Sequence, residues 1–439
     1  GQRASFTARV KPIHGMLAPG GWDYEFYWRV RDAFYRAYSW STRDVDWGPQ
    51  PAAPLSRARE YLRGRIVDGV SGPDGRVGRG GAVVLALLTG DRDLLDLDTI
   101  DTVRAAGLVH TLALSGLHVG FVAGLGAALA WLLGRAWPGL YLRVPRPRLA
   151  VLLAAPLVLA YVWLGQASPT LVRAACMFAS FAVLLWMGRG RVLLDGLFAA
   201  LGVIVLTFPL AVFDLSLQLS AAAVAGIILF LPWLRRLWRW QPAQGRWGRL
   251  ARAGLGGPAV VLATSLCASV ALLPLTSWYF GLSAPNVLPN VVWLPLMGLV
   301  VLPLALAGLP LAALAWTRPV GDALLAAAAH VMDAMLAGLD AVAHAGALPV
   351  LAVLRPLWPE MLGFAVMLAV AAAAVSGASR TAWGALGLGV ALLLWPHVAS
   401  LAGQAAGRTS LTLLDVGQGQ AAVVEAPGGG RWLVDGGGT

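Results

Sequence analysis

Long apolar segments recur along the chain between about residue 108 and residue 400, and short polar or basic stretches separate them. Because a helix rises about 1.5 Å per residue, roughly 20 apolar residues cross the hydrocarbon core of a bilayer. About ten such segments fit this length, at residues 110–134, 148–165, 169–188, 191–212, 214–232, 255–277, 286–316, 321–344, 359–376 and 381–400. The pattern predicts an all-α, polytopic membrane protein with about ten transmembrane helices.

Two of these segments differ from a simple crossing. The segment at 286–316 is longer than one crossing needs and contains several prolines, so we expect it to be broken into two pieces. In the segment at 321–344, aspartates and histidines interrupt a run of alanines. This second segment fits a span, and it fits equally an amphipathic helix that lies in the membrane interface.

The ends of the chain have a different pattern. Residues 1–50 are polar, aromatic and rich in turn residues, which indicates the end of a small β domain. Residues 51–107 are helical in pattern and extracytoplasmic or interfacial; the stretch GAVVLALLTG within them is too short to span and is expected in the interface or packed against other helices. After the transmembrane region at 108–400, residues 401–439 change to short β-like stretches around glycine-rich turns, which indicates the start of a second β-containing domain.

Composition narrows the class of protein. Apolar residues make up 58% of the chain and charged residues only 13%, against about 25% charged residues in soluble proteins. This balance excludes an ordinary soluble globular protein. The two cysteines, Cys176 and Cys267, lie inside apolar segments, so we expect neither a disulfide nor a metal site there.

The formal net charge of +11 comes mostly from short loops of the membrane region. Those loops contain Arg135, Arg143, Arg146, Arg148, Arg189, Arg191, Arg235, Arg236, Arg239, Arg246, Arg249 and Arg252. Arginine-rich short loops face the cytoplasm. We therefore favour a topological role for this charge over a nucleic-acid patch, and we expect both termini on the extracytoplasmic side.

The stretch HTLALSGLHVG, residues 110 to 120, carries polar side chains at the head of the first span. On a helix, Ser115 and His118 lie about 60° apart. Gly116, Gly120 and Gly124 form a separate stripe with small-xxx-small spacing, which is expected to let another helix approach closely. Ser115 and His118 then line a path or form interhelix hydrogen bonds, and a Ser/His nucleophile pair without an orienting acid is a further alternative.

Polar residues also mark the heads of other spans. His110 stands near the outer end of the first span, either as an interface anchor or as a functional residue. Others stand in ASPTLVRAACM, FDLSLQLSAAAVAG and GLSAPNVLPNVVWLP, namely Ser168, Arg173, Asp214, Gln218, Asn286 and Asn290. Helix capping and snorkelling explain some of these residues equally well. Together they predict an entrance vestibule on the outer side, without identifying what enters it.

Several of these stretches, taken in order, resemble the ComEC family of competence proteins. The resemblance rests on LLTGDR, AGLVHTLALSGLHVG, SPTLVRAACM, DLSLQLSAAAVAGI and TSWYFGLSAPNVLPNVVWLP. Upstream, HGMLAPGGWDYE is similar to the end of the family's extracytoplasmic OB-like domain. Downstream, LLDVGQGQAAVV and LVDGGG are similar to the first strands of its metallo-β-lactamase-like domain.

The resemblance implies a multi-pass channel of the cytoplasmic (inner) membrane that takes up single-stranded DNA during natural transformation. It also implies partners: the DNA strand, membrane lipid, an extracytoplasmic DNA receptor and cytoplasmic DNA-handling proteins. The polar residues of the vestibule then become candidates for the DNA path.

Two features limit what this chain is expected to do. It begins with Gly1 and ends at Thr439, before any His-x-His-x-Asp-His segment, so we interpret it as a fragment without catalytic or metal-ligating residues and without a cofactor. A nuclease activity and its divalent metal would belong to the missing C-terminal part. In the part of that domain present here, Gln420 stands where many relatives have an acidic residue. Two other classes stay open: a membrane-embedded Ser/His enzyme, and a secondary transporter, which the lack of an internal repeat disfavours.

Overall fold

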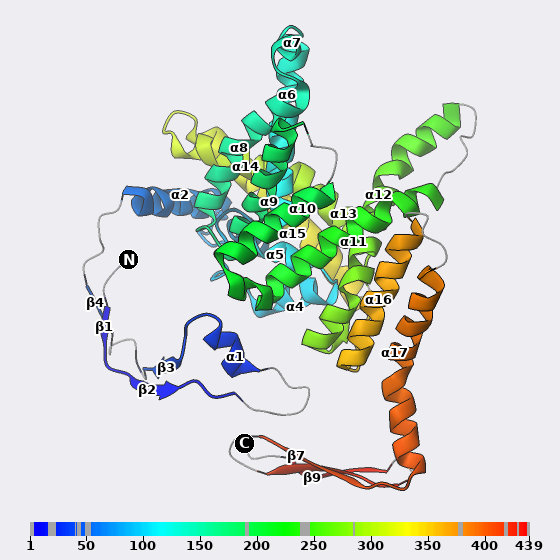
Figure 1. The fold of residues 1–439 in the computed structure, drawn as a ribbon. Coiled ribbons are helices and arrows are strands. Elements are labelled where there is room, and N and C mark those ends of the chain that lie inside the picture. The colour runs from blue at the N-terminus through cyan, green and yellow to red at the C-terminus, as the bar shows by residue number, and fades with distance from the viewer. Residues whose placement is uncertain are drawn as a thin grey trace. The chain divides into compact units, whose positions relative to one another are not determined.

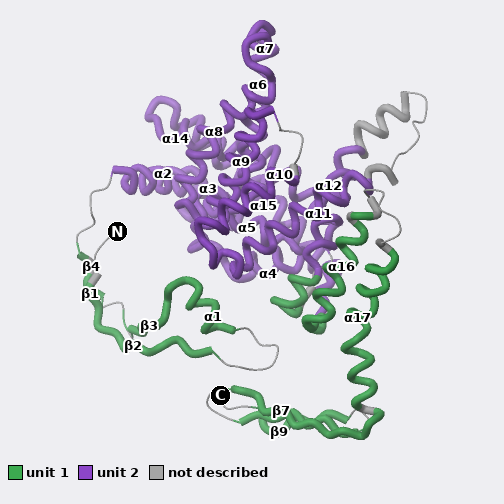
Figure 2. Tube along the Cα trace, in the orientation of Figure 1, with its two compact units in different colours: residues 1–53, 274–281, 353–439 green, residues 54–273, 282–352 purple. Residues whose placement is uncertain are grey.

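The chain forms two compact units (Figure 2). The computed structural model describes residues 4–15, 23–39, 41, 45–48, 54–188, 193–237, 246–283, 286–375, 381–416, 420–427 and 430–436. Unit 1 comprises Gly1–Ala53, Pro274–Gly281 and Val353–Thr439, and unit 2 comprises Pro54–Leu273 and Leu282–Ala352. Most of the described chain is helical, with small sheets near both ends, which confirms the predicted helical fold in its broad form (Figure 1).

Unit 2 is a helical bundle. Its first helices are α2 (Pro54–Val70), α3 (Arg79–Thr89), α4 (Leu97–Ala105), α5 (Val109–Leu112), α6 (Gly116–Ala136), α7 (Leu140–Arg143), α8 (Arg146–Leu164) and α9 (Pro169–Trp186). They are followed by α10 (Leu193–Thr207), the 3-10 helix η2 (Pro209–Phe213), α11 (Leu215–Leu237), α12 (Arg246–Phe280), α13 (Pro289–Leu296), the π-helix η3 (Met297–Val301), α14 (Leu302–Ala313) and α15 (Arg318–His344). The last residues of α12 belong to unit 1, and the short strands β5 (Leu282–Ser283) and β6 (Leu351–Ala352) pair antiparallel.

Unit 1 contains the sheets and two further helices. Its elements are β1 (Ala4–Phe6), β2 (Arg9–Pro12), α1 (Tyr24–Arg29), β3 (Tyr35–Tyr38), β4 (Val45–Trp47), α16 (Trp358–Val375), α17 (Thr381–Ala405), β7 (Ser410–Leu414), β8 (Ala421–Glu425) and β9 (Arg431–Gly436). β1 pairs with β4 and β2 with β3, while β7, β8 and β9 form one antiparallel sheet. The strands of unit 1 therefore lie near the two ends of the chain, where the sequence predicts β structure.

Eight helices in the described chain are long and apolar enough to cross a membrane. They comprise α6, α8, α9, α11, α12, the continuous run from α13 to α14, α15 and α17. The segments predicted at 191–212 and 359–376 also form helices, α10 and α16, but their apolar parts are shorter. The structure thus supports eight candidate spans, fewer than the predicted ten.

The predicted break in the segment at 286–316 is wrong. The helix runs without interruption from Pro289 to Ala313, and its middle part is the π-helix η3. A proline ring lacks an N–H group and crowds the preceding turn of an α-helix. The wider π-helical turn lies between Pro295 and Pro303, and it lets the backbone accommodate both rings without ending the helix.

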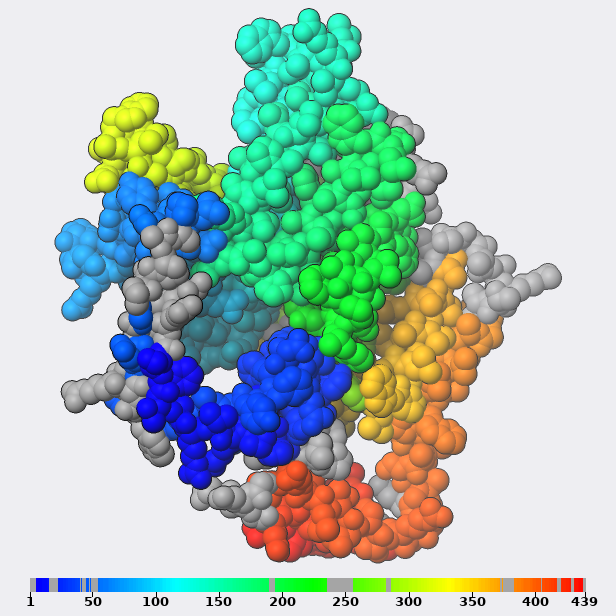
Figure 3. All heavy atoms as spheres, turned by 60° about the vertical axis from the view of Figure 1, so that its left-hand side comes forward, coloured from blue at the N-terminus to red at the C-terminus, as the bar shows by residue number. Residues whose placement is uncertain are grey.

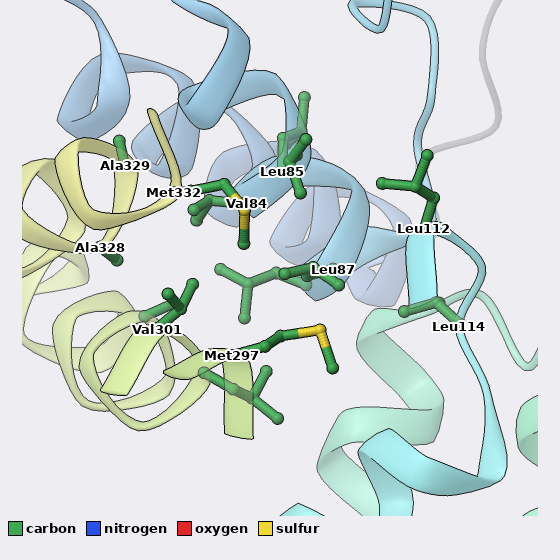
Figure 4. Packing of buried hydrophobic residues seen from close by; sticks show 14 of the residues in the cluster. Val84, Leu85, Leu87, Leu112, Leu114, Met297, Val301, Ala328, Ala329 and Met332 are labelled. Atoms are coloured by element: carbon green, nitrogen blue, oxygen red, sulfur yellow. The ribbon is translucent and has the colours of Figure 1, made fainter. Parts of the chain in front are cut away.

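Helix α3 lies at the centre of the hydrophobic core of unit 2. Every residue from Gly80 to Thr89 is buried. Figure 4 shows Leu87 of this helix beside Met297 and Val301, with Leu112 and Leu114 on the other side. Of the two positions predicted for this short apolar stretch, the one packed against other helices is therefore the observed one.

The aspartates that interrupt the segment at 321–344 face α2 and α3. Asp322 accepts a hydrogen bond from Arg65 Nη2 at 2.8 Å, and Asp340 accepts one from Arg79 Nη1 at 2.7 Å. Asp333 accepts one at 2.6 Å from the backbone N–H of Gly80, at the start of α3. These bonds explain why α15 remains one continuous helix despite its polar residues, because each carboxylate has a partner within the protein.

Candidate functional site

Ser115 and His118 form a capping box at the start of α6. Ser115 is the N-cap residue, and its backbone N–H donates to His118 Nδ1 over 3.1 Å. The Ser115 hydroxyl lies 2.9 Å from the same nitrogen. Since Nδ1 accepts the backbone hydrogen bond, a neutral ring carries its proton on Nε2. His118 is fully buried, and its Nε2 has no hydrogen-bond partner within the described part of the chain.

The buried row of α6 lies opposite the predicted glycine stripe. His118, Val122 and Gly126 are buried at four-residue spacing, and a shift of two residues turns a helix by about 200°. A Cβ atom on Gly126 would lie 2.5 Å from the Cα atom of Ala154 in α8, so this glycine allows the close helix approach.

Within the described chain, most of the stripe itself makes no close contact with another helix. A Cβ atom on Gly120 or Gly124 would meet no described atom within 4 Å, and both residues are exposed. Gly116 has one ordinary contact, at 3.7 Å from Ala174 Cβ in α9. Spacing alone separates the two opposite faces of α6, and within the described chain the close helix approach is found on the face of Gly126.

Leu114 lies where three of the sequence motifs meet. A Cβ atom on Gly90, in LLTGDR, would lie 2.8 Å from Leu114 Cδ1, and one on Gly165, just before SPTLVRAACM, would lie 2.6 Å from it. Gly90 also ends α3 with a left-handed φ of 78°, a conformation that glycine adopts without strain. These glycines hold the segment before α6 against the ends of α3 and α8.

The residue after Gly90 is part of a bonded turn. Asp91 accepts hydrogen bonds from Arg63 Nε at 2.6 Å and from the backbone N–H of Asp93 at 2.9 Å. Burial raises the pKa of Asp91, but these hydrogen bonds outweigh burial and hold the pKa below its ordinary value. The carboxylate therefore stays charged and fixes the turn after α3 to α2.

Trp293 of α13, in the motif TSWYFGLSAPNVLPNVVWLP, connects a fourth motif to the segment before α6. Its indole Nε1 donates to Thr111 Oγ1 of α5 over 3.0 Å, and both side chains are buried. Asn290 lies one helical turn earlier, is 8% exposed, and its Oδ1 has no partner within the described residues. Neither Thr111 nor Trp293 was among the predicted site residues, although both lie within the quoted motifs.

Arg173 joins the starts of α9 and α11. Its Nη1 donates to Asp214 Oδ1 over 3.1 Å, and its Nη2 donates to the hydroxyl of Ser216. The same carboxylate accepts from the backbone N–H of Leu217, which caps α11. Arg173 is 8% exposed and its Nε has no partner among the residues described, so this side chain points into the protein and does not snorkel to the surface. Ser216 was missed, although it stands in the run of alternate polar positions.

Among the remaining predicted residues, Asn286 bonds to two distant parts of the chain. Its amide donates to the carbonyl oxygens of Ala105, at 2.6 Å, and of Pro349, at 3.1 Å. The others form local pairs: Gln218 Nε2 with Val212 O at 2.9 Å, Ser168 Oγ with Thr170 Oγ1 at 3.2 Å, and His110 Nδ1 with Gly107 O at 3.2 Å. These contacts hold loops and helix starts in place. In the part of the chain that the structure describes, no three metal-ligating side chains come together.

A basic surface in unit 1 was also missed. In the register of β2 and β3, Arg9 lies opposite Tyr38 and Lys11 lies opposite Arg36, so all four share one face of the pair. Every residue of both strands is exposed. In the sequence, the alternation of basic and other residues in RVKP is the pattern that indicates this basic surface. Basic and aromatic side chains on one face are the combination that surfaces binding single-stranded nucleic acid use.

Comparison with known proteins gives the family. Residues 87–381, more than half of the chain, match the model of a family described as Competence protein. Competence protein ComA of Neisseria gonorrhoeae is 31% identical over 320 residues, which cover 70% of this chain and 41% of that protein. ComE operon protein 3 of Bacillus subtilis (strain 168) is 29% identical over 236 residues, which cover 53% of this chain and 26% of that protein.

A further relative has no assigned role. The uncharacterised protein YcaI of Escherichia coli (strain K12) is 26% identical over 311 residues, which cover 70% of this chain and 38% of that protein. The chain thus spans less than half the length of each of these relatives. No solved structure matches it. The extent of the family match, together with motifs that meet around the start of α6, confirms the predicted resemblance: the chain belongs to the competence protein family.

Proposed function

We propose that this chain forms the membrane part of a channel that takes up single-stranded DNA across the cytoplasmic membrane during natural transformation. One observation carries the proposal. Buried polar atoms of three helix starts have no partner among the described residues: Nε2 of His118, Nε of Arg173 and Oδ1 of Asn290. Polar groups at membrane depth need partners, and a hydrated, polar strand supplies both donors and acceptors. Family membership adds support through the competence relatives.

In this proposal the strand enters near the starts of α6, α9, α11 and α13. Arg173 and the proton on His118 Nε2 offer hydrogen bonds to phosphate oxygens, while Asn290 accepts from a base or from water. The pair of Arg173 with Asp214 keeps the guanidinium oriented before the strand arrives. Contacts of this kind bind the DNA backbone and do not depend on the base sequence.

The proposal includes a topology. Helices α10 and α16 would complete ten crossings, the arginine-rich loops would face the cytoplasm, and both termini would lie on the extracytoplasmic side. A reporter fused after Arg408 tests this arrangement. Cytoplasmic activity of the reporter would contradict the crossing number or the place of α15.

The proposed partners of this topology are an extracytoplasmic DNA receptor and cytoplasmic DNA-handling proteins. The chain itself would catalyse nothing and hold no cofactor, and any metal-dependent nuclease would belong to a further domain of the whole protein.

The central test is uptake of labelled DNA by cells that carry His118→Ala, Arg173→Gln or Asn290→Ala, at equal protein levels. We expect each variant to lower transformation at least tenfold, because each removes a polar contact from the path. His330→Ala and Arg318→Gln are matched controls, since both side chains are exposed on α15. If all three variants take up DNA normally, the channel proposal fails.

A second candidate function rests on the 2.9 Å separation between the Ser115 hydroxyl and His118 Nδ1. A Ser/His pair at this distance is the arrangement of an activated nucleophile. Against it, the same nitrogen already accepts the Ser115 backbone N–H, and within the described chain no carboxylate bonds to the ring. Labelling of the purified protein by a serine-directed probe, lost in Ser115→Ala, would favour the enzyme over the channel.

A further inference from the structure

The end of α6, α7 and the start of α8 form a surface that we call the basic tip, residues 131–148. It carries four arginines, Arg135, Arg143, Arg146 and Arg148, of which the first three are exposed. No aspartate or glutamate occurs between Asp101 and Asp195 in the sequence. Among the ion pairs of the described residues none involves the basic tip. In Figure 3 this segment stands at the top of unit 2, in cyan.

Packing fixes the shape of the basic tip. The Tyr141 hydroxyl donates to the carbonyl oxygen of Ala130 over 2.8 Å. The Tyr141 ring fills the space beside Gly134, where an added Cβ atom would lie only 2.0 Å from it. Helix α7 is therefore held against the last turns of α6, and its outward residues keep a defined position.

Large apolar side chains of the basic tip face outward beside the arginines. Leu142 is 91% exposed and Trp137 is 70% exposed. Exposure of these two large apolar side chains to water is unfavourable. The surface thus combines uncompensated positive charge with apolar groups that lack an apolar environment in the protein.

Two of the arginines lie over tryptophan rings at the helix ends. The guanidinium of Arg135 lies 5.8 Å from the centre of the Trp131 ring. That of Arg148 lies 5.2 Å from the centre of the Trp186 ring at the end of α9, and its Nη2 donates to the Trp186 carbonyl oxygen at 3.4 Å. Tryptophan beside arginine is typical of the level where lipid headgroups meet the hydrocarbon core.

We infer that the basic tip is a binding surface for anionic phospholipids. Arg143 and Arg146 contact the headgroup phosphates, while Trp137 and Leu142 insert among the upper parts of the acyl chains. A lipid satisfies both halves of the surface, whereas a nucleic acid would neutralise the arginines and leave Leu142 in water. The inference does not depend on DNA uptake, so the two proposals can fail separately.

The test uses the full chain purified in a neutral detergent, with phosphatidylglycerol added to the micelles. The midpoint of thermal unfolding is followed as a function of lipid concentration, which gives an apparent Kd. We expect phosphatidylglycerol to raise the midpoint and phosphatidylcholine to raise it less. The double variant Arg143→Gln/Arg146→Gln should bind phosphatidylglycerol about 30-fold more weakly.

The control Arg92→Gln/Arg318→Gln removes the same charge from exposed positions outside the basic tip and should bind as the unmodified chain does. Leu142→Gln keeps all arginines and should weaken binding about threefold. Equal binding by the two double variants would overturn the inference, as would equal responses to the two lipids. A full response to inorganic phosphate would indicate a free-phosphate site, and displacement of the lipid by a thymidine oligonucleotide would indicate a DNA surface; either result overturns the lipid assignment.

Discussion

Where α2 and α3 meet α15, polar groups of the three helices bond to one another, whereas at the starts of α6, α9 and α13 several buried polar atoms have no partner among the described residues. Arg65, Asp333 and Asp340 belong to the first region and each accepts or donates within the protein. His118 and Asn290 belong to the second. A fully bonded polar group stabilises one arrangement of helices, while a buried polar group without a partner leaves the cost of its desolvation without compensation. The comparison separates polar residues that build the bundle from those that we propose act on a substrate.

The largest effect on stability is expected from Arg65→Met. Arg65 donates to Asp68, Asp322 and the carbonyl oxygen of Ala312, and its side chain is 8% exposed. Its loss leaves two carboxylates and a carbonyl without their donor, at a cost of about 3 kcal/mol. Arg104→Met is the control, because Arg104 and its partner Asp101 are both well exposed, so its cost should stay below about 1 kcal/mol. Denaturation in detergent measures both, and equal costs would contradict the distinction between buried and exposed pairs.

Next in size is Gly126→Ala. The new methyl group would lie 2.5 Å from the Ala154 backbone, which forces α6 and α8 apart at a cost of about 2 kcal/mol. The matched variant Gly120→Ala adds the same group where no described atom lies within 4 Å, and it should stabilise α6 by about 0.5 kcal/mol. A destabilised Gly120→Ala would show that the stripe packs against something after all.

A smaller effect is expected from Asp333→Asn. The asparagine oxygen can still accept from the Gly80 N–H, so only the charge at the start of α3 is lost. The favourable interaction of that charge with the helix dipole is worth about 1 kcal/mol in a partly buried setting. The midpoint of thermal unfolding should fall by a few degrees, which is a smaller decrease than the one expected for Asp333→Ala. The reverse order of the two variants would argue against the capping role.

The smallest effect on stability, and the sharpest separation of the two regions, is expected from His118→Leu. The substitution removes a capping bond of about 1 kcal/mol, but it also removes a buried N–H without a partner, which offsets much of that loss. Unfolding should therefore change by less than about 1 kcal/mol while DNA uptake falls at least tenfold. Loss of stability in parallel with uptake would assign His118 to the structural group.

The sequence predicted the positions of the helices well because bilayer thickness and hydrophobicity constrain each segment independently. Which face of a helix packs depends on its neighbours, so spacing within α6 could not distinguish Gly120 from Gly126. The same holds for α15. In the sequence, Asp322 and Asp340 only interrupt the apolar pattern, because their partners on α2 and α3 are distant along the chain. Within the site, the sequence predicted the members of the pair Arg173 and Asp214 but not the bond between them, which joins residues 41 positions apart.

The length of α3 has a consequence for how the protein tolerates change. A helix of 11 residues is about 16 Å long, roughly half the thickness of the hydrocarbon core. It cannot reach both membrane surfaces, so its ends need partners supplied by the chain. These are the Asp333 carboxylate at one end and, at the other, the backbone N–H of Gly90, which donates to the carbonyl oxygen of Ala86. Because all residues from Gly80 to Thr89 are buried, substitutions along α3 should follow the rules of a soluble protein's interior, where volume matters, and not those of a surface in contact with lipid, where any apolar residue serves.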